Sequence, residues 1–489
     1  MRLLSTRGLS APVDAPEAVL RGIAPDGGLY IPDEIPAIPP QELWGADFCT
    51  LAQRILCAYL PGYTEDEIRL CVQRAYHHTF DTDEITPLRA VGNQYVLELF
   101  HGPTAAFKDV ALSILPQLMG AALKKKGVHE DVMILTATSG DTGSAALTGF
   151  CNVRGIRVLV FYPEQGISPI QRAQMTTMRG GNLHVCAIRG NFDDAQAGVK
   201  RIFAQMPADF CRAHGFTLSS ANSINIGRLA PQIVYYYDAY LKLVRAGRIQ
   251  MGEPVDFSVP TGNFGDILAG YLARLSGLPV GRLICASNAN NVLTDFLRTG
   301  VYDRNRPFHT TISPSMDILI SSNLERLLFD LSGENDAEIR MYMDALGSAG
   351  RYQVSDNIKA KLDDAFWGGC CSEEETEKTI RRYWQDHNYL IDPHTAVAAE
   401  VLAQYRVASG DETPAVVVST ASPYKFCGSV LTAIGETPCG DGLELLDQLH
   451  AVSGVPVPCR LAELKRKSRR FDKTVEKQAM EQAVLDFLK

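Results

Sequence analysis

The sequence predicts an α/β fold, and three observations support this. From about residue 96 the chain repeatedly passes from a short β-rich apolar run through a glycine-containing turn into a helical stretch, which is the pattern of α/β proteins. The chain has 489 residues, 46% apolar and 21% charged, which is enough for several globular domains. It contains no low-complexity tract and no repeat of solenoid period.

Residues 1–95 differ from the rest, because they contain few long apolar runs and a proline-rich stretch at 32–40. We expect them to form an N-terminal cap on the main body. The segment 96–250 starts at an apolar strand, 95–100, followed by a helix that ends at Gly127 after three lysines. We expect a lobe that includes a smaller α/β domain.

The segment 251–455 is predicted to be a large α/β lobe, with strands at 257–260 and 415–419. The acidic stretch 373–386 is predicted to be a peripheral helical insertion. The tail, 456–489, is expected to be helical and is highly charged.

Charge and cysteine content limit the partners. Lys plus Arg total 47 and Asp plus Glu total 56, a net charge of −9, so no global field favours nucleic acid or an anionic membrane. The N-terminus has no apolar signal region, and no run of 18 apolar residues occurs. Twelve scattered cysteines without a CxxC pair favour a reducing compartment. We therefore expect a soluble cytoplasmic protein with a small-molecule ligand, as a monomer or homodimer.

Lys108 is the first candidate for chemistry. It follows the strand at 95–100 and lies at the expected N-terminus of the next helix. The positive end of the helix dipole and burial beside apolar neighbours both disfavour an ammonium ion and lower the pKa of the amine. A neutral amine there can form a Schiff base or move protons. The alternative is a surface lysine at a frayed helix start.

The turn Thr261-Gly-Asn-Phe-Gly-Asp266 joins an expected strand to a helix. Its two glycines let backbone N–H groups converge, and the helix N-terminus adds a favourable field, so a phosphate monoester is the expected ligand. The spacing matches neither a dinucleotide fingerprint nor a P-loop. A tight turn without ligand is the alternative.

Two further segments carry polar side chains. Thr138-Ser-Gly-Asp-Thr-Gly-Ser144 lies at another strand end and suits a carboxylate or a second phosphate, with a plain helix N-cap as the alternative. In Asn222-Ser-Ile-Asn-Ile-Gly-Arg228 the asparagines and the arginine recur every third residue, so on a helix they share a face. That face offers a fork for phosphate or carboxylate, and the alternative is a solvated helix face.

The strand 415–419 places Ser419 and Thr420 at its C-terminal end, where open α/β sheets bind ligands. A neutral hydroxyl that faces a pyridine nitrogen exchanges one hydrogen bond without enforcing protonation. The alternative is a buried residue of high β propensity. His77 and His78 have no matching ligand set, so we expect a surface pair and no metal site.

In this order, the motifs resemble the threonine synthase family, which are pyridoxal-phosphate enzymes of fold type II, the tryptophan synthase β group. The resemblance covers roughly residues 22–426. Its landmarks are Gly22-Ile-Ala-Pro-Asp-Gly-Gly-Leu-Tyr-Ile-Pro32, Leu99 to Asp109, TATSGDTGSAA, Tyr162-Pro163 with Gly166-Ile-Ser-Pro169, SANSINIGRL, VPTGNFGD, Asp392-Pro-His-Thr395 and STASPYKF. The resemblance implies a two-lobed α/β enzyme with the N-terminal cap and with pyridoxal 5′-phosphate between the lobes.

The resemblance also implies residue roles. Lys108 is the implied catalytic lysine, and Thr420 is implied to supply the hydroxyl at the pyridine nitrogen. The implied cofactor-binding residues are Lys108, Phe107, Gly262, Asn263, Phe264, Gly265, Asp266 and Thr420. The implied substrate-binding residues are Thr104, Ser139, Asp141, Thr142, Asn222, Ser223, Asn225 and Arg228.

The implied activity is the conversion of O-phospho-L-homoserine and water into L-threonine and phosphate by γ-elimination and β-hydration. The alternatives are a related phospho-lyase that gives 2-oxobutyrate and a non-catalytic ligand-binding relative, against which the retention of Lys108 and the 261–266 turn argues. Ser422 and Tyr424 stand where many family members have histidine and alanine. This departure bears on substrate preference more than on cofactor binding.

Overall fold

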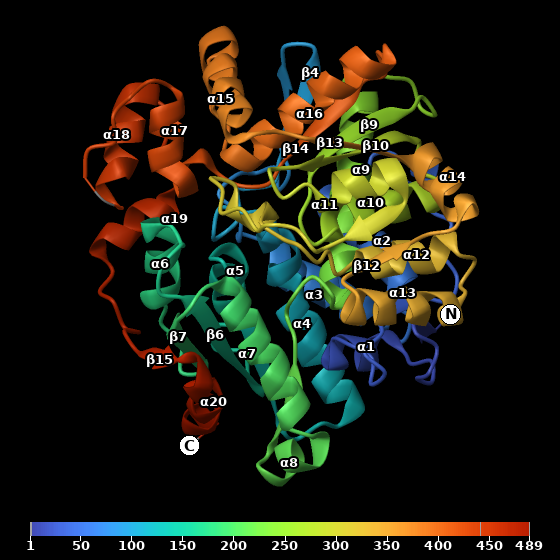
Figure 1. Cartoon of the computed structure of the whole chain (residues 1–489), viewed down its shortest axis with the longest axis vertical. Coiled ribbons are helices and arrows are strands. Elements are labelled where there is room, and N and C mark those ends of the chain that lie inside the picture. Colours follow the sequence, from blue (N-terminus) through green and yellow to red (C-terminus); the bar gives the residue numbers. More distant parts are fainter. Residues whose placement is uncertain (1, 441, 489) are drawn as a thin grey trace.

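Two sheets organise the molecule, and a computed structural model describes it over residues 2–440 and 442–488 (Figure 1). The larger sheet has the order β13 (Phe366–Cys370), β10 (Val280–Ser287), β9 (Val255–Pro260), β14 (Ala415–Ser419), β4 (Gln94–Glu98) and β3 (Leu88–Val91). Its strands are parallel except for the antiparallel pair β3–β4. The α/β fold class predicted from the sequence is confirmed.

The smaller sheet is entirely parallel. Its order is β15 (Thr474–Glu476), β7 (Leu183–Arg189), β6 (Ile156–Pro163), β5 (Asp131–Ala137) and β8 (Phe216–Ser219). Strands covered by helices on both faces read as continuous apolar runs. The central strands of both sheets follow this rule, since all of β9 and β14 and nearly all of β6 are buried.

Long helices fill the space around the sheets. α9 (Ile226–Arg245) is buried over most of its length and packs against α2 (Phe48–Tyr59), α4 (Lys108–Lys126) and α10 (Gly265–Leu275). On the other face of the larger sheet lies α16 (Pro393–Ser409). The smaller sheet is flanked by α5 (Asp141–Gly149), α6 (Pro169–Thr176) and α7 (Phe192–Gln205) (Figure 1).

The remaining elements are shorter or more peripheral. The helices are α1 (Ala15–Arg21), α3 (Glu65–Tyr76), α8 (Ala208–Ala213), α11 (Val292–Thr299), α12 (Leu324–Leu331), α13 (Asp336–Ser348), α14 (Asp356–Ala365), α15 (Glu373–His387), α17 (Cys427–Ala433), α18 (Glu444–Ser453), α19 (Cys459–Ala462) and α20 (Met480–Leu488). The strands β1 (Leu3–Ser5) and β2 (Tyr30–Pro32) pair with each other, as do β11 (Val301–Asp303) and β12 (Arg351–Gln353). Single 3-10 turns lie at Pro40–Leu43, Pro314–Met316, Pro423–Phe426, Glu463–Arg466 and Lys477–Ala479.

The N-terminal region packs its helices on the helices of the main body. α2 is capped by Asp47, and α3 begins with a capping box of Thr64 and Glu67, which satisfies the free amides of each first turn. The apolar face of α2 packs on α9, and that of α3 packs on α4. The boundary expected at residue 95 lies within a hairpin of β3 and β4, whose two-residue turn at 92–93 includes a left-handed Gly92.

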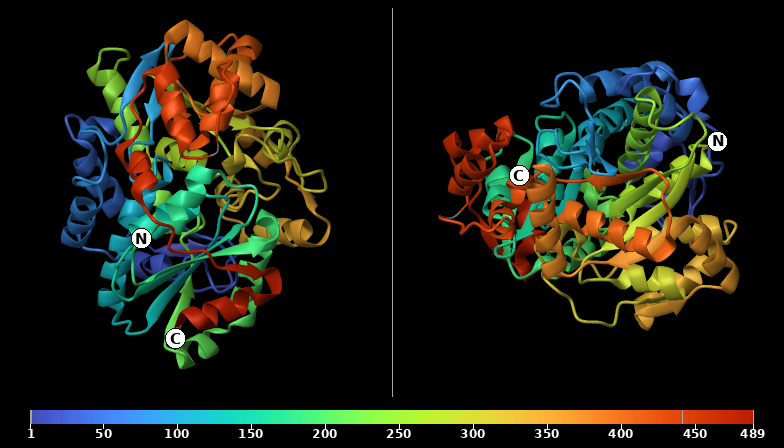
Figure 2. Two further views of the ribbon diagram at one scale, coloured as in Figure 1. Left: turned by 90° about the vertical axis from the view of Figure 1, so that its left-hand side faces the viewer. Right: turned by 90° about the horizontal axis from the view of Figure 1, so that it is seen from above.

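The prediction of an entirely helical tail is wrong. After α19 the chain runs to β15, which pairs with β7 in parallel, and only then enters α20, which packs on α7 and β7. The last segment therefore covers an edge of the smaller sheet (Figure 2). The acidic stretch 373–386 is helical, as predicted, within α15.

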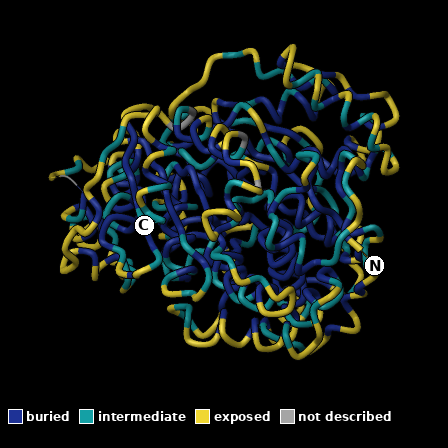
Figure 3. Tube along the Cα trace, turned by 90° about the horizontal axis from the view of Figure 1, so that it is seen from below, coloured by how far each residue is buried: buried dark blue, intermediate teal, exposed yellow. Residues whose placement is uncertain are grey.

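Buried chain concentrates around the two sheets, and exposed chain lies at the periphery (Figure 3). Separate apolar clusters cover the two faces of each sheet. Among the helices described, none is long and apolar enough to cross a membrane.

Candidate active site

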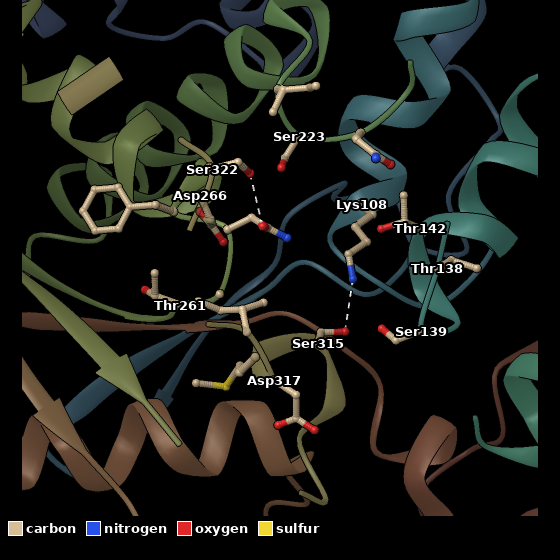
Figure 4. Close-up of a pocket in the computed structure, with 18 of the residues that line it drawn as sticks. Lys108, Thr138, Ser139, Thr142, Ser223, Thr261, Asp266, Ser315, Asp317 and Ser322 are labelled. Carbon is tan, nitrogen blue, oxygen red and sulfur yellow. Dashed lines mark hydrogen bonds between the residues drawn. The ribbon is translucent and has the colours of Figure 1, made fainter. Parts of the chain in front are cut away.

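A cavity of about 250 Å³ lies where the carboxyl ends of strands from both sheets meet the N-terminus of α4. Figure 4 shows side chains from these elements converging on it. The larger sheet contributes the turn after β9 and Thr420 after β14, and the smaller sheet contributes the turn after β5. All eight predicted cofactor-binding residues line this one cavity: Phe107, Lys108, Gly262, Asn263, Phe264, Gly265, Asp266 and Thr420.

Lys108 is the first residue of α4, as the sequence predicted. The strand-to-helix turn before it is fixed to the end of β14, because Phe107 N donates to Thr420 O at 2.8 Å and Ser422 N donates to Ala105 O at 3.1 Å. Its side chain is 11% exposed, and Nζ lies 3.3 Å from Asp141 Oδ2. Burial lowers the pKa of the Lys108 amine, and the neighbouring Asp141 carboxylate only partly opposes this shift.

Asp141 is the first residue of α5 and is shared among several donors. Its Oδ1 lies 2.7 Å from Lys425 Nζ and accepts from Gln171 Nε2 at 2.8 Å. Its Oδ2 faces Lys108 Nζ and accepts from Ser315 Oγ at 3.1 Å. Burial alone raises the pKa of Asp141, but the two lysines outweigh it and hold this pKa well below its usual range. Asp141 is therefore an ionised carboxylate between two amines.

The turn from Gly262 to Asp266 presents its backbone to the cavity. Phe264 has φ of +61° and caps α10, which starts at Gly265. Within the described residues, none of the five amides from Gly262 to Asp266 donates to a protein acceptor. A Cβ at Gly262 would lie 2.6 Å from the carbonyl oxygen of Ser315, so only glycine fits there. Free amides at a helix N-terminus form an anion site.

Asp266 stands beside these amides but is not paired with a cation. Its Oδ1 accepts from Tyr235 OH at 2.6 Å and from Tyr236 OH at 2.9 Å, and its buried Oδ2 has no partner. Burial raises the pKa of Asp266 to about 6. Asp266 is therefore more readily protonated than an exposed aspartate, and its protonated form does not repel a neighbouring anion.

Five of the predicted substrate-binding residues line the cavity: Ser139, Thr142, Asn222, Ser223 and Arg228. Arg228 is buried, donates from Nη1 to Ala221 O at 2.6 Å, and has no partner at Nε. Burial lowers the pKa of Arg228 to about 10. A buried, incompletely paired guanidinium on a cavity wall is a site for phosphate or carboxylate.

Two other predicted residues serve the scaffold. Thr104 holds Asp109, with its amide 2.8 Å and its hydroxyl 2.7 Å from the two carboxylate oxygens. Asn225 is the N-cap of α9, and its side-chain amide donates to Val19 O and Ser220 O. Neither lines the cavity.

The expected helical face shared by Asn222, Asn225 and Arg228 is also wrong, because α9 begins only at Ile226. Asn222 and Ser223 reach the cavity from the turn before the helix. The asparagine amide that was expected to face a ligand caps the helix, which is the commonest use of this residue type at such a position.

Three residues in or behind the cavity carried no separate prediction. Ser315 belongs to the 3-10 turn Pro314–Met316, which has no sequence motif, and its hydroxyl lies 3.2 Å from Lys108 Nζ (Figure 4). His394 lines the cavity, donates or accepts through Nδ1 at 2.7 Å from Asp392, and accepts from the Ser315 amide at 3.2 Å. Lys425 and His394 stand inside segments that carry the family resemblance, which was the available signal; Ser315 had none.

The site fits the cofactor that the resemblance implies. It combines a buried amine, a glycine turn whose amides are free, and a strand-end hydroxyl at Thr420, all on one cavity. These are the groups that an aldehyde, a phosphate monoester and a pyridine nitrogen require. Among the described residues, no group of three or more His, Cys, Asp or Glu side chains is arranged to hold a metal ion.

Three family models match the chain in sequence. "Threonine synthase N terminus" matches residues 2–76, "Pyridoxal-phosphate dependent enzyme" matches residues 85–349, and "Threonine synthase, C-terminal" matches residues 395–484. The first lies in the cap, and the third runs from the large lobe, where it includes Thr420, into the tail. The second contains Lys108 and the 262–266 turn.

Individual proteins are similar over nearly the whole chain. Threonine synthase of Pseudomonas aeruginosa is 42% identical over 446 residues, which are 90% of this chain and 92% of that protein. Human "Threonine synthase-like 1" is 40% identical over 86% of this chain and 58% of its own length. The crystal structure of PLP-bound threonine synthase from Brucella melitensis matches with a TM-score of 0.88 and 37% identity, covering 100% of both chains.

Proposed function

The chain belongs to the threonine synthase family and is a pyridoxal-phosphate-dependent lyase, and from this premise we propose that its cavity converts O-phospho-L-homoserine and water into L-threonine and phosphate. One observation supports this assignment most: the Lys108 amine and the free amides of residues 262–266 open onto the same cavity. An amine for the cofactor aldehyde and a cradle for its phosphate must face one another across the length of a pyridine ring.

We assign the cofactor contacts accordingly. Lys108 provides the amine, the amides from Gly262 to Asp266 hold the phosphate, and the hydroxyl of Thr420 faces the pyridine nitrogen. When bound, pyridoxal phosphate supplies an aldehyde for an amine and a ring that withdraws electrons from the substrate α-carbon. The protein supplies position and proton transfer.

Lys108 is the proton carrier. Burial lowers the pKa of the Lys108 amine and so favours its neutral form, which can accept a proton from the α-carbon and return it later. The hydroxyl of Ser315, 3.2 Å from Nζ, orients the amine toward the cavity. Asp141 remains ionised beside it and stabilises the ammonium that forms after proton uptake.

Arg228, Asn222 and Ser223 supply a second anion site on the wall formed by the start of α9. We propose that these three groups take one acidic group of the substrate, and that Ser139 and Thr142, at the turn after β5, take the other. The unpartnered Nε of Arg228 leaves one strong donor free for this purpose. A substrate with both a carboxylate and a phosphate uses both walls.

The test is incubation of the cofactor-loaded enzyme with O-phospho-L-homoserine and identification of every product. We expect threonine and inorganic phosphate in equal amounts. Phosphate without an amino-acid product would contradict the proposal.

A second candidate is a phospho-lyase that releases 2-oxobutyrate, the alternative that the family resemblance in the sequence leaves open. The same product analysis separates the two. The unusual residues Ser422 and Tyr424 do not line the cavity: Ser422 Oγ accepts from Tyr424 N, and Tyr424 OH donates to Val455 O. Their departure from the family pattern is therefore weak support for a change of substrate.

We also propose that the enzyme works in the cytoplasm on small molecules alone, as a monomer or homodimer. All twelve cysteines are free thiols, which suits a reducing compartment.

A further inference from the structure

Lys425 is a buried cation directly behind the reactive amine. Its side chain is 0% exposed, and Nζ lies 2.7 Å from Asp141 Oδ1 and donates to Thr104 O at 2.9 Å. It does not line the cavity and so cannot touch a ligand there. A fully buried lysine is costly unless its charge is paired, so its position calls for a reason.

The two lysines compete for one carboxylate. Lys425 contacts Asp141 at 2.7 Å, whereas Lys108 contacts it at 3.3 Å. Lys425 also has the carbonyl of Thr104, while the second partner of Lys108 is the hydroxyl of Ser315. The shorter ion pair and the carbonyl both favour placing the charge on Lys425.

Among the residues that the structure describes, Asp141 is the one carboxylate in ion-pair contact with Lys108. A further carboxyl, Asp109, has its two oxygens occupied by the amide and hydroxyl of Thr104, and burial raises the pKa of Asp109. The other charged group that faces Lys108 is Arg228 on α9, a cation. Gln171 on α6 and Ser315 are neutral. With Lys425, Arg228 and Asp141 charged, protonation of Lys108 would add a second uncompensated positive charge.

We propose that Lys425 is the permanent counter-cation of Asp141 and that, by occupying this carboxylate, it keeps the Lys108 amine uncharged and ready to react. Lys425 is thus a positioning residue, since it acts through Asp141 and not on the ligand. The lowered pKa of Lys108, to which burial contributes most and Lys425 also contributes, agrees with this arrangement.

The inference rests on the proposed role of Lys108, but its test needs neither cofactor nor substrate. The full-length protein, freed of cofactor, is acetylated with acetic anhydride, and the peptide that contains Lys108 is quantified by mass spectrometry against the exposed Lys124 of the same helix. Only the neutral amine reacts, so the relative rate reports the charge state of Lys108. A failure of the proposed function leaves this measurement unaffected.

In Lys425→Met, Asp141 has Lys108 as its only cation within contact. We expect Lys108 to react about tenfold more slowly or less at pH 8, since one pKa unit is tenfold in neutral fraction. In the matched control Lys425→Arg, which keeps the charge, the rate should stay within about threefold of the original. An unchanged rate in the methionine variant, or an equal loss in the arginine variant, overturns the proposal.

Asp141→Asn keeps the proposal testable if the methionine variant does not fold. Without the carboxylate, Lys108 faces only cations, so its acetylation should become faster. An unchanged or slower rate would overturn the proposal. The cofactor-loaded enzyme gives a further readout. The pH midpoint of its visible absorbance should rise in Lys425→Met and not in Lys425→Arg. Identical midpoints in the original enzyme and both variants would overturn the proposal.

Discussion

The two glycine turns of the active site share an architecture but differ in how their polar groups are used. Each follows a parallel strand and opens a helix, β5 to α5 in one sheet and β9 to α10 in the other. In the first turn, Thr138 Oγ1 accepts from the amides of Gly140 and Gly143 at 2.9 and 3.0 Å. In the second, none of the amides from Gly262 to Asp266 has a protein acceptor in the described chain.

The carboxylates of the two turns differ in the same sense. Asp141 is held ionised by two lysines, whereas Asp266 has only tyrosine hydroxyls and a raised pKa. The first turn therefore presents the ionised carboxylate of Asp141 beside the Lys108 amine. The second turn presents backbone amides that are free to bind an anion. Similar sequence patterns at strand ends thus do not imply similar ligands; what matters is which amides are already used.

Removal of the Lys108 amine should give the largest difference between the roles of the two turns. In Lys108→Ala we expect turnover to fall by about a thousandfold or more, because the general base is lost. The amides of residues 262–266 remain, so pyridoxal phosphate should still bind, measured by equilibrium dialysis. If the variant kept most of its turnover, the proton carrier would be elsewhere. If it lost all cofactor binding, the second turn would not be the main anion site.

The opposite change is Gly262→Ala. The new Cβ would lie 2.6 Å from Ser315 O, and overpacking of this kind costs roughly 1–3 kcal/mol, which is about 5- to 150-fold in the cofactor dissociation constant. Acetylation of Lys108 in the cofactor-free protein should change little. The control is Gly181→Ala, where a Cβ meets nothing within 4 Å. Equal cofactor affinity in both variants would show that the second turn does not bind the cofactor phosphate.

Thr138→Val tests whether the first turn satisfies itself. The substitution removes the hydroxyl that accepts from Gly140 and Gly143, and each buried amide left without a partner costs about 1–3 kcal/mol. We expect a lower free energy of unfolding in urea, with cofactor affinity nearly unchanged. Thr148→Val, which removes a half-buried hydroxyl that donates to a helix carbonyl, is the comparison. A larger effect on cofactor affinity than on the free energy of unfolding would show that the first turn also binds the cofactor, as the second turn is proposed to do.

Local patterns were sufficient to predict the strands that lead to the cavity, the turns that follow them and the place of Lys108 at a helix start. A strand, a glycine turn and a helix are specified by neighbouring residues, so both turns and the start of α4 lie where the sequence predicted. The carboxyl ends of parallel strands meet at one edge, which is why the eight predicted cofactor-binding residues line one cavity. The tail differed because β15 depends on a free edge of β7, more than 280 residues earlier in the chain.

The hydrogen-bond and ion-pair partners of Asp141 could not be predicted from the sequence alone. Asp141 was predicted as a substrate contact, but its neighbours Lys425, Gln171 and Ser315 come from three distant segments. Asn225 has the spacing of a ligand-binding side chain and the chemistry of a helix cap, and only the helix boundary decides between them. Side-chain partners of this kind are set by tertiary packing, which no local spacing encodes.

The smallest expected effect concerns Asp266. Its folded pKa of about 6 lies above that of an unfolded aspartate, so its contribution to stability is complete at low pH and is lost as the pH rises through about 6. The asparagine in Asp266→Asn cannot ionise. Measured without cofactor, the melting temperature of the variant minus that of the original protein should therefore increase from pH 5 to pH 7. Asp209→Asn, at a side chain that is 95% exposed, should show no such trend. If both variants show the same pH trend of melting temperature, Asp266 ionises like a surface carboxylate. The negative charge of Asp266 would then repel the anion that the amides of the second turn are arranged to bind.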